Sequence, residues 1–151
     1  MFALKNSRYL AVGLVASMAM ANLSLPRQAS ADEPNPDFMA LKQAVLDGKD
    51  FRMVVDLSAC QVHDTDRAGP AVRGSIRFDA YMVQRDDTVA FSTTHFTFRA
   101  DHTPVTEFLS YRVRPTGKVT ARTIILNPMT YSALQESEFD CDIGKGVTFH
   151  W

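Results

Sequence analysis

The two cysteines are the residues of this sequence with the most definite chemistry. Cys60 and Cys141 are the only cysteines among 151 residues, and they lack the C-x-x-C spacing of thiol–disulfide oxidoreductases. In an exported chain, an even number of cysteines is most simply explained by disulfide formation. Because the N-terminal segment predicts export, we expect a Cys60–Cys141 bridge rather than two reduced thiols in the core. With both sulfurs paired, no thiol would remain to act as a nucleophile.

His95 is the candidate for acid–base chemistry. A hydrolase would need it beside a nucleophile and an orienting acid, and Ser92 with Asp56 or Asp79 could supply them. Ser92, however, lacks the flanking glycines of the G-x-S-x-G nucleophile elbow. The favoured interpretation is a histidine satisfied by neighbouring hydroxyls within a sheet, and we predict no catalytic residue. A small secreted hydrolase using His95 is the alternative.

A metal site is the third kind of chemistry to consider. His63, Asp64 and Asp66 lie close together in one predicted loop, and imidazole and carboxylate groups are competent metal ligands. The sequence contains neither H-E-x-x-H nor the pattern of a calcium-binding loop. We therefore interpret the segment as a solvated polar loop and predict no metal and no cofactor.

The first residues of the chain form an export signal. Lys5 and Arg8 precede an apolar run at 9–21, and small residues at 29–31 match the A-x-A pattern of a signal peptidase site. The apolar run is shorter than the ~20 residues that a membrane-spanning helix needs. We predict a secretory signal peptide over 1–31 and a periplasmic or secreted protein without a membrane span.

The mature chain is then a single domain over 32–151, with a cut after Ala21 as the alternative. Removal of Lys5, Arg8 and Arg27 leaves 13 basic residues against 17 acidic ones, a net charge of −4. This length suffices for one hydrophobic core. A mildly acidic domain has no basic excess that would indicate nucleic acid as a partner.

The elements of this domain are one helix followed by strands. Asn35 as N-cap, Pro36 at the first helical position and Gly48 as the stop predict a helix over 36–47, with an apolar stripe through Phe38 and Val45. Alternating apolar residues and short turns predict about six antiparallel strands. These strands are expected at 51–57, 76–82, 88–98, 105–114 and 118–126, and at 139–142 joined to 147–151.

The fold class is therefore α+β and mainly β. We expect the amphipathic helix to pack on a curled, barrel-like meander sheet that the disulfide closes. A hairpin centred on Thr116 would place Phe108, Ile124 and Leu126 on one face, while the other face is also apolar. One face should line an interior, and the helix should cover part of the other. The alternative is an exposed apolar patch at these three residues, as in an inhibitor or adaptor.

The strand expected at 88–98 changes phase. Val89 and Phe91 are odd-numbered, whereas Phe96 and Phe98 are even-numbered. Either a bulge shifts the register, or the two ends of the strand are apolar on opposite sides. In the second case His95 would point toward the interior.

A curled sheet of this kind favours ligand binding. The residues that could give a cavity directional contacts are Thr93, His95, Tyr111 and Arg112. Arg122 shares a hairpin face with Arg112, so the two could meet an anion. Surface arginines more commonly serve solubility.

Four segments together resemble one bacterial family. They are Val-Val-Asp-Leu-Ser-x-Cys at 54–60, Ala-Phe-Ser-x-x-His-Phe-Thr at 90–97, Phe-Leu-x-Tyr-Arg-Val at 108–113 and Cys-x-Ile-Gly-x-Gly-Val-x-Phe at 141–149. As a set they are similar to the VirK family, small exported bacterial proteins associated by name with virulence regions in plant-interacting bacteria. The resemblance implies export and a single small domain, and it supplies no catalytic residues. We therefore expect a non-enzymatic binding or interaction protein that supports host association, whose partner is a protein or small molecule.

Overall fold

The computed structural model describes residues 33–78 and 80–151, and the predicted signal peptide at 1–31 lies outside them. Within that part of the chain, one α-helix, one 3-10 turn and nine strands make the protein mainly β, as predicted. The helix is not long and apolar enough to cross a membrane. In chain order the elements are α1 (Pro36–Leu46), β1 (Arg52–Asp56), η1 (Leu57–Ala59), β2 (Gln61–Val62), β3 (Arg73–Arg77), β4 (Ala80–Val83), β5 (Val89–Phe98), β6 (Pro104–Val113), β7 (Lys118–Leu126), β8 (Ala133–Ile143) and β9 (Gly146–His150).

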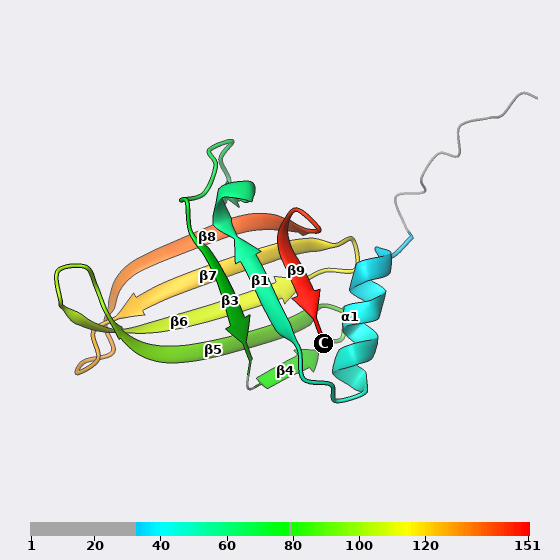
Figure 1. Ribbon diagram of the computed structural model, residues 1–151, viewed down its shortest axis with the longest axis horizontal. Coiled ribbons are helices and arrows are strands. Elements are labelled where there is room, and N and C mark those ends of the chain that lie inside the picture. Colours follow the sequence, from blue (N-terminus) through cyan, green and yellow to red (C-terminus); the bar gives the residue numbers. More distant parts are fainter. Residues whose placement is uncertain (1–32, 79) are drawn as a thin grey trace, which may run out of the picture.

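All nine strands belong to one curled sheet. Its order is β3-β1-β9-β8-β7-β6-β5-β4, and β2 pairs with β8 outside this path. Figure 1 shows the long strands β5 to β8 side by side, with β1, β3 and β9 crossing in front of them and α1 at one end. The sheet is therefore a half-barrel. The crossing strands cover one half of the long strands, and the other half extends past them.

One predicted strand is in fact two, which partly explains why there are nine strands rather than six. Segment 76–82 was expected to form a single strand with Phe78 and Met82 on the same face. Instead, β3 pairs with β1 at one edge of the sheet, and β4 pairs with β5 at the opposite edge. Phe78 is buried, but in β4 it is Tyr81 and Val83 that pack against the core, while Met82 is 58% exposed. The predicted alternation was wrong because the chain passes from one sheet edge to the other.

The end of the chain also forms two strands. β8 begins at Ala133, six residues before the strand expected from residue 139, and it pairs with β7 along most of its length. The chain then turns at Gly144 into β9, which runs antiparallel to β1. The first and last strands of the domain are therefore neighbours.

The helix forms as predicted but packs elsewhere. The Asn35 side chain accepts hydrogen bonds from the backbone N–H groups of Asp37 and Phe38, at 2.9 and 3.2 Å, which satisfies two of the free donors at the helix start. Gly48 follows the helix with φ of +68°. Phe38, Leu41 and Val45 of α1 join the same core as the inner side of the sheet. The expectation that the helix covers the opposite face was wrong, because its apolar stripe helps to close the open half-barrel.

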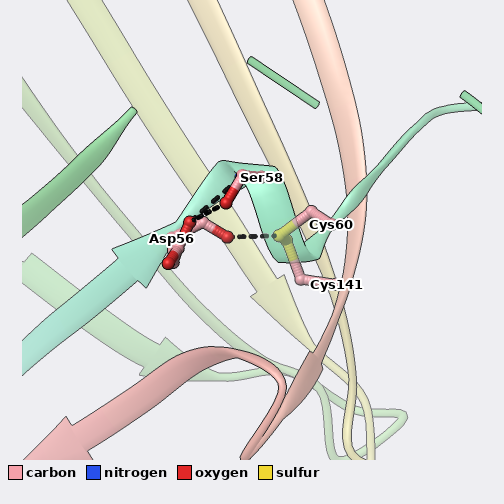
Figure 2. Close-up of a disulfide and its surroundings, with 4 residues drawn as sticks. All are labelled: Asp56, Ser58, Cys60 and Cys141. Atoms are coloured by element: carbon pink, nitrogen blue, oxygen red, sulfur yellow. Dashed lines mark hydrogen bonds between the residues drawn. A yellow bond between two sulfur atoms is a disulfide. The ribbon is translucent and has the colours of Figure 1, made fainter. Parts of the chain in front are cut away.

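The predicted disulfide is present. Cys60 and Cys141 are joined, with Cα atoms 4.5 Å apart, so the turn after β1 is bonded to β8 (Figure 2). Gly146 has φ of +95°, and a Cβ atom there would lie 2.7 Å from the Cys60 sulfur. Only glycine leaves room for the bridge at this point.

Aromatic rings fill the core between the crossing strands and the long strands. Phe91 lies at the centre, with ring centroids 4.4 Å from Phe78, 5.6 Å from Tyr111 and 5.7 Å from Phe51. All four side chains are at most 4% exposed. Such tilted, edge-to-face and stacked contacts stabilise a core beyond the burial of area alone.

The sequence correctly predicted the register of the β6–β7 hairpin. The turn at Gly117, with φ of +84°, pairs Val113 with Val119 and continues into the β6–β7 ladder. The β5–β6 ladder is also continuous, from Val89 to Phe98. The change of phase in β5 is therefore not a bulge, and the two ends of this strand are apolar on opposite sides.

Candidate functional site on the outer face of the long strands

The long strands have an inner and an outer face. The inner face carries the buried side chains Phe91, Tyr111, Ala121 and Phe139, and the paired positions of each ladder extend it along all four strands. The outer face carries the alternate residues, among them Arg112 and Phe96. This division determines which predicted site residues can act together.

The four predicted ligand-binding residues are not gathered in one site. Thr93 and His95 lie on the inner face, but beyond the core, where His95 is exposed. Tyr111 is on the same face within the aromatic core, and burial raises the pKa of its hydroxyl to about 12, with a smaller contribution from the carboxylate of Glu107. Arg112 lies on the outer face, on the other side of the sheet.

His95 instead has a local partner. Its Nε2 lies 2.9 Å from a carboxylate oxygen of Glu107, the residue directly opposite it on β6. Ser92 projects from the outer face of β5, so Ser92 and His95 lie on opposite sides of the sheet. Asp56 belongs to β1, where it accepts hydrogen bonds from Ser58 and Arg73.

Those contacts have an electrostatic consequence for Asp56. Its hydrogen bonds with Ser58 and then with Arg73 lower the pKa of the Asp56 carboxyl. Because Ser92 lies on the other side of the sheet and Asp56 is bonded to Ser58 and Arg73, the described residues do not assemble a triad around His95. The other acid considered, Asp79, lies outside them.

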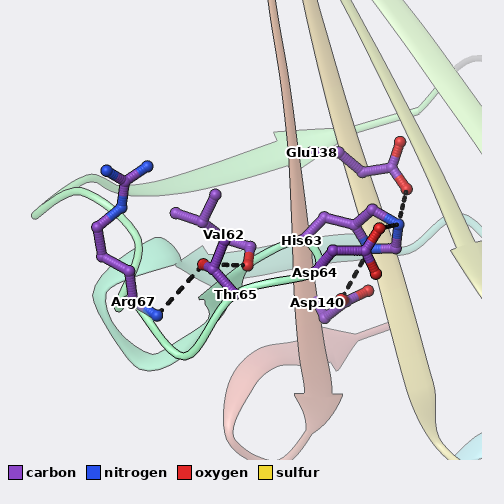
Figure 3. Close-up of polar contacts among 7 residues, drawn as sticks. All are labelled: Val62, His63, Asp64, Thr65, Arg67, Glu138 and Asp140. Carbon is purple, nitrogen blue, oxygen red and sulfur yellow. Dashed lines mark hydrogen bonds and ion pairs between the residues drawn. The ribbon is translucent and has the colours of Figure 1, made fainter.

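The loop that was considered for metal binding is organised around His63 (Figure 3). His63 Nδ1 lies 2.8 Å from Asp140, and Nε2 lies 3.5 Å from Asp64 and 3.6 Å from Glu138. The hydrogen bond to Asp140, followed by the charges of the three acids, raises the pKa of the His63 imidazole. Between residues 33 and 151, residue 79 aside, no group of three or more His, Cys, Asp or Glu side chains is arranged to hold a metal ion.

Three arginines lie beside this histidine on the outer face. Arg112, Arg114 and Arg122 line a depression of about 350 Å³ together with His63, Glu138 and the hydroxyl residues Ser110 and Thr120. We call this feature the arginine depression. Arg122 is held by Glu136 at 2.8 Å. Within residues 33–78 and 80–151, no carboxylate forms a salt bridge with Arg112 or Arg114.

The other half of the outer face is apolar. Phe96 and Phe98 are 59% and 61% exposed, and their rings meet edge to face at 5.4 Å. The three residues of the patch anticipated from the sequence are half-buried and lie on this same face, across β6 and β7. We call the set of five the apolar patch; its members are Phe96, Phe98, Phe108, Ile124 and Leu126.

Reasoning from the sequence missed part of this surface. It paired Phe108 with Ile124 correctly but did not join Phe96 and Phe98 to them. The signal was available in the change of phase along β5, since a continuous ladder places both even-numbered phenylalanines on the face of Phe108. Reasoning from the sequence also paired Arg112 with Arg122 but did not include Arg114.

Comparison with known proteins places the chain in a family. The model of the VirK protein family matches residues 34–131. Two similar proteins are "Uncharacterized protein y4wH" of Sinorhizobium fredii, 34% identical over 74% of this chain and 78% of that protein, and "Uncharacterized protein in pinF2 3'region" of Rhizobium radiobacter, 34% identical over 72% and 76%. The fold is similar to the crystal structure of a VirK family protein from Legionella pneumophila, with a TM-score of 0.68 at 24% identity, covering 76% of this chain and 95% of that one. The chain belongs to the VirK family.

Proposed function

We propose that this protein is an exported, non-catalytic interaction protein that binds a partner protein on the outer face of β5 to β8. The observation that carries the proposal is the apolar patch, where two phenylalanines that the core does not need are more than half exposed. Contiguous exposed apolar surface bordered by polar residues is typical of protein-binding sites. Membership of the VirK family supports a role in host association, as the family name implies.

The charged half of the surface narrows the chemistry of the partner. Phe108 and Arg112 point to the same side of β6 four residues apart, which corresponds to about 13 Å along a strand. A partner that fits both features presents aromatic or aliphatic side chains to the apolar patch and carboxylates to the arginine depression. Arginine favours carboxylates through its paired, planar donors.

Export is supported by the disulfide and by the signal-like start of the chain. Disulfides persist in oxidising compartments and are rare in the cytosol. Fractionation of cells that produce the full chain should place it in the periplasm or medium, shortened by about 31 residues. Full-length protein in the cytoplasm with free thiols would contradict export.

The proposal that the protein is not an enzyme is supported by the separation of Ser92 from His95 across the sheet. It predicts no hydrolysis of p-nitrophenyl esters by the purified protein above the background rate, and no change in His95→Ala. Turnover that disappears in His95→Ala while the melting temperature is retained would instead favour a hydrolase.

Site-specific photocrosslinking in the producing bacterium tests the binding surface. A photoreactive phenylalanine analogue at position 98 should form an adduct with one partner protein, identified by mass spectrometry. The matched control is the same analogue at Leu46, which is equally exposed but lies on α1. Arg112→Glu should reduce the adduct by at least about tenfold, because like charges across an interface cost several kcal/mol. Equal yields of the same adduct from positions 98 and 46 would contradict a binding surface on this face.

A further inference from the structure

The backbone of β5 presents hydrogen-bonding groups on both of its edges. The N–H of Arg99 donates to the Thr103 carbonyl at 3.0 Å, continuing the β5–β6 ladder, so odd-numbered residues of β5 direct their backbone groups toward β6. On the other side, the N–H of Gln84 donates to the Thr88 carbonyl at 2.8 Å, continuing the β4–β5 ladder. The even-numbered residues of β5 therefore direct their backbone groups away from β6.

β4 covers only part of that outward edge. Its four residues pair with Val89 to Ser92, and Figure 1 shows β4 alongside only one end of β5. In the part of the chain that the structure describes, no strand and no backbone hydrogen-bond partner meets the outward groups of Thr94, Phe96 and Phe98. This open edge is as long as a short strand.

The sequence of this edge favours pairing. An open edge is normally protected by charges, by proline or by being short. The opposite edge of the sheet follows this rule, since β3 has five residues and carries Arg73 and Arg77 at its ends. Segment 94–98, Thr-His-Phe-Thr-Phe, has no proline, lysine or acid, and it consists of residue types that suit strands.

We propose that the open edge of β5 pairs with β5 of a second copy of this chain, forming a two-fold symmetric dimer through one continuous sheet. A symmetric antiparallel pair can be centred on a residue whose backbone points outward, and Phe96 is the middle one of the three such residues. Phe96 then faces Phe96 of the partner subunit, and Thr94 faces the partner's Phe98. Three such pairs provide about six backbone hydrogen bonds, two in each pair.

The side chains are compatible with this register. Phe96 and Phe98 lie on the outer face, so the aromatic rings of both copies would gather at the two-fold axis, where cross-strand aromatic pairs stabilise a sheet. On the inner face His95 lies opposite the partner's Thr97, so no like charges meet. Edge pairing also leaves the outer face uncovered, and it joins the apolar patches of the two copies.

Charge variants at the two-fold axis test the dimer. Phe96→Lys and Phe96→Glu each place like charges directly opposite each other, and each should raise the dimer dissociation constant at least about tenfold by sedimentation equilibrium. Mixing the two variants should restore a dimer, because opposite charges then meet. Leu46→Lys is the matched control, an exposed apolar residue on α1 that should not affect association.

Three outcomes would overturn the proposal. The first is a wild-type protein that stays monomeric at about 100 µM, a concentration far above the micromolar dissociation constants of many specific contacts. The second is a dimer that survives both single variants, and the third is a mixture of the two variants that does not form a dimer. A monomer that binds an extended peptide at this edge would assign the edge to a different occupant. An adduct between position 98 and a second copy of the chain would support this pairing, whereas an adduct with another protein tests the outer face, so the two proposals fail separately.

Discussion

The two halves of β5 differ in the burial of their aromatic side chains and in the pairing of their edge, although they belong to one continuous strand. In the half that contains Val89 and Phe91, the inward side chains are at most 4% exposed and β4 covers the edge. We call this half of β5, with the core that packs on it, the covered half. In the half that contains Phe96 and Phe98, the aromatic side chains are exposed on the outer face and the edge is open among the described residues. One half stabilises the fold, and the other half presents apolar surface that the fold does not use. That contrast is the main reason to place binding at the second half.

Among the changes considered, removal of the disulfide should cause the largest loss in the free energy of unfolding, through the covered half. Cys60 and Cys141 are 81 residues apart, and in the chain-entropy model closure of such a loop stabilises the fold by about 4 to 5 kcal/mol. This is a large share of the roughly 5 to 15 kcal/mol of a typical domain. The double variant Cys60→Ser/Cys141→Ser should therefore lose most of its free energy of unfolding in urea titrations.

Wild-type protein treated with a reducing agent is the control and should match this double variant. An unchanged unfolding midpoint in both samples would show that the bridge does not stabilise the covered half.

The next test makes the same substitution, phenylalanine to alanine, once in each half of β5. Phe91→Ala should cost about 3 to 5 kcal/mol, as for other buried aromatic residues. Phe98→Ala should change the free energy of unfolding by no more than about 0.5 kcal/mol, as expected for a surface position. Thermal or urea unfolding of the two variants provides the measurement. Similar losses from both would mean that the apolar patch is part of the core.

The smallest effect on stability should come from His63, which lies beside Asp140 of β8 on the outer face. Its pKa is raised in the folded state, chiefly by Asp140, so its contribution is complete below the unfolded value of about 6.5. That contribution is lost as the pH rises through the higher folded pKa. The melting temperature of the wild type should exceed that of His63→Gln at pH 5.5, and the difference should shrink above pH 6.5.

Asp140→Asn is the partner control for this prediction, and it should lower the His63 pKa in an NMR titration. A difference between wild type and His63→Gln that grows with pH would contradict the assigned cause.

The features predicted correctly were those fixed by local chemistry or, for the disulfide, by composition. The helix followed from Asn35, Pro36 and Gly48, which determine where a helix begins and ends. The β6–β7 register followed from the turn at Gly117, because one turn sets the pairing of a whole hairpin. The disulfide followed from the count of cysteines in a chain expected to be exported.

The features that were missed depend on contacts between distant segments. Alternation continues through 76–82, so nothing local shows that the chain leaves one edge of the sheet and joins the other. The predicted ligand-binding set failed to gather because strand parity puts Arg112 on the opposite face from His95. Which part of β5 remains uncovered depends on the length of β4 and on the crossing strands, and neither can be read from β5 alone.

Residue-resolved hydrogen exchange along β5 tests the difference between its halves most directly. The outward amides of Ala90 and Ser92 are paired with β4, whereas those of Thr94, Phe96 and Phe98 belong to the open edge. In dilute protein the open-edge amides should exchange much faster than Ala90 and Ser92. Their exchange should slow as the concentration rises and copies pair. Equal protection of all five amides in dilute protein would contradict the account, because it would mean that the second half of β5 is already covered.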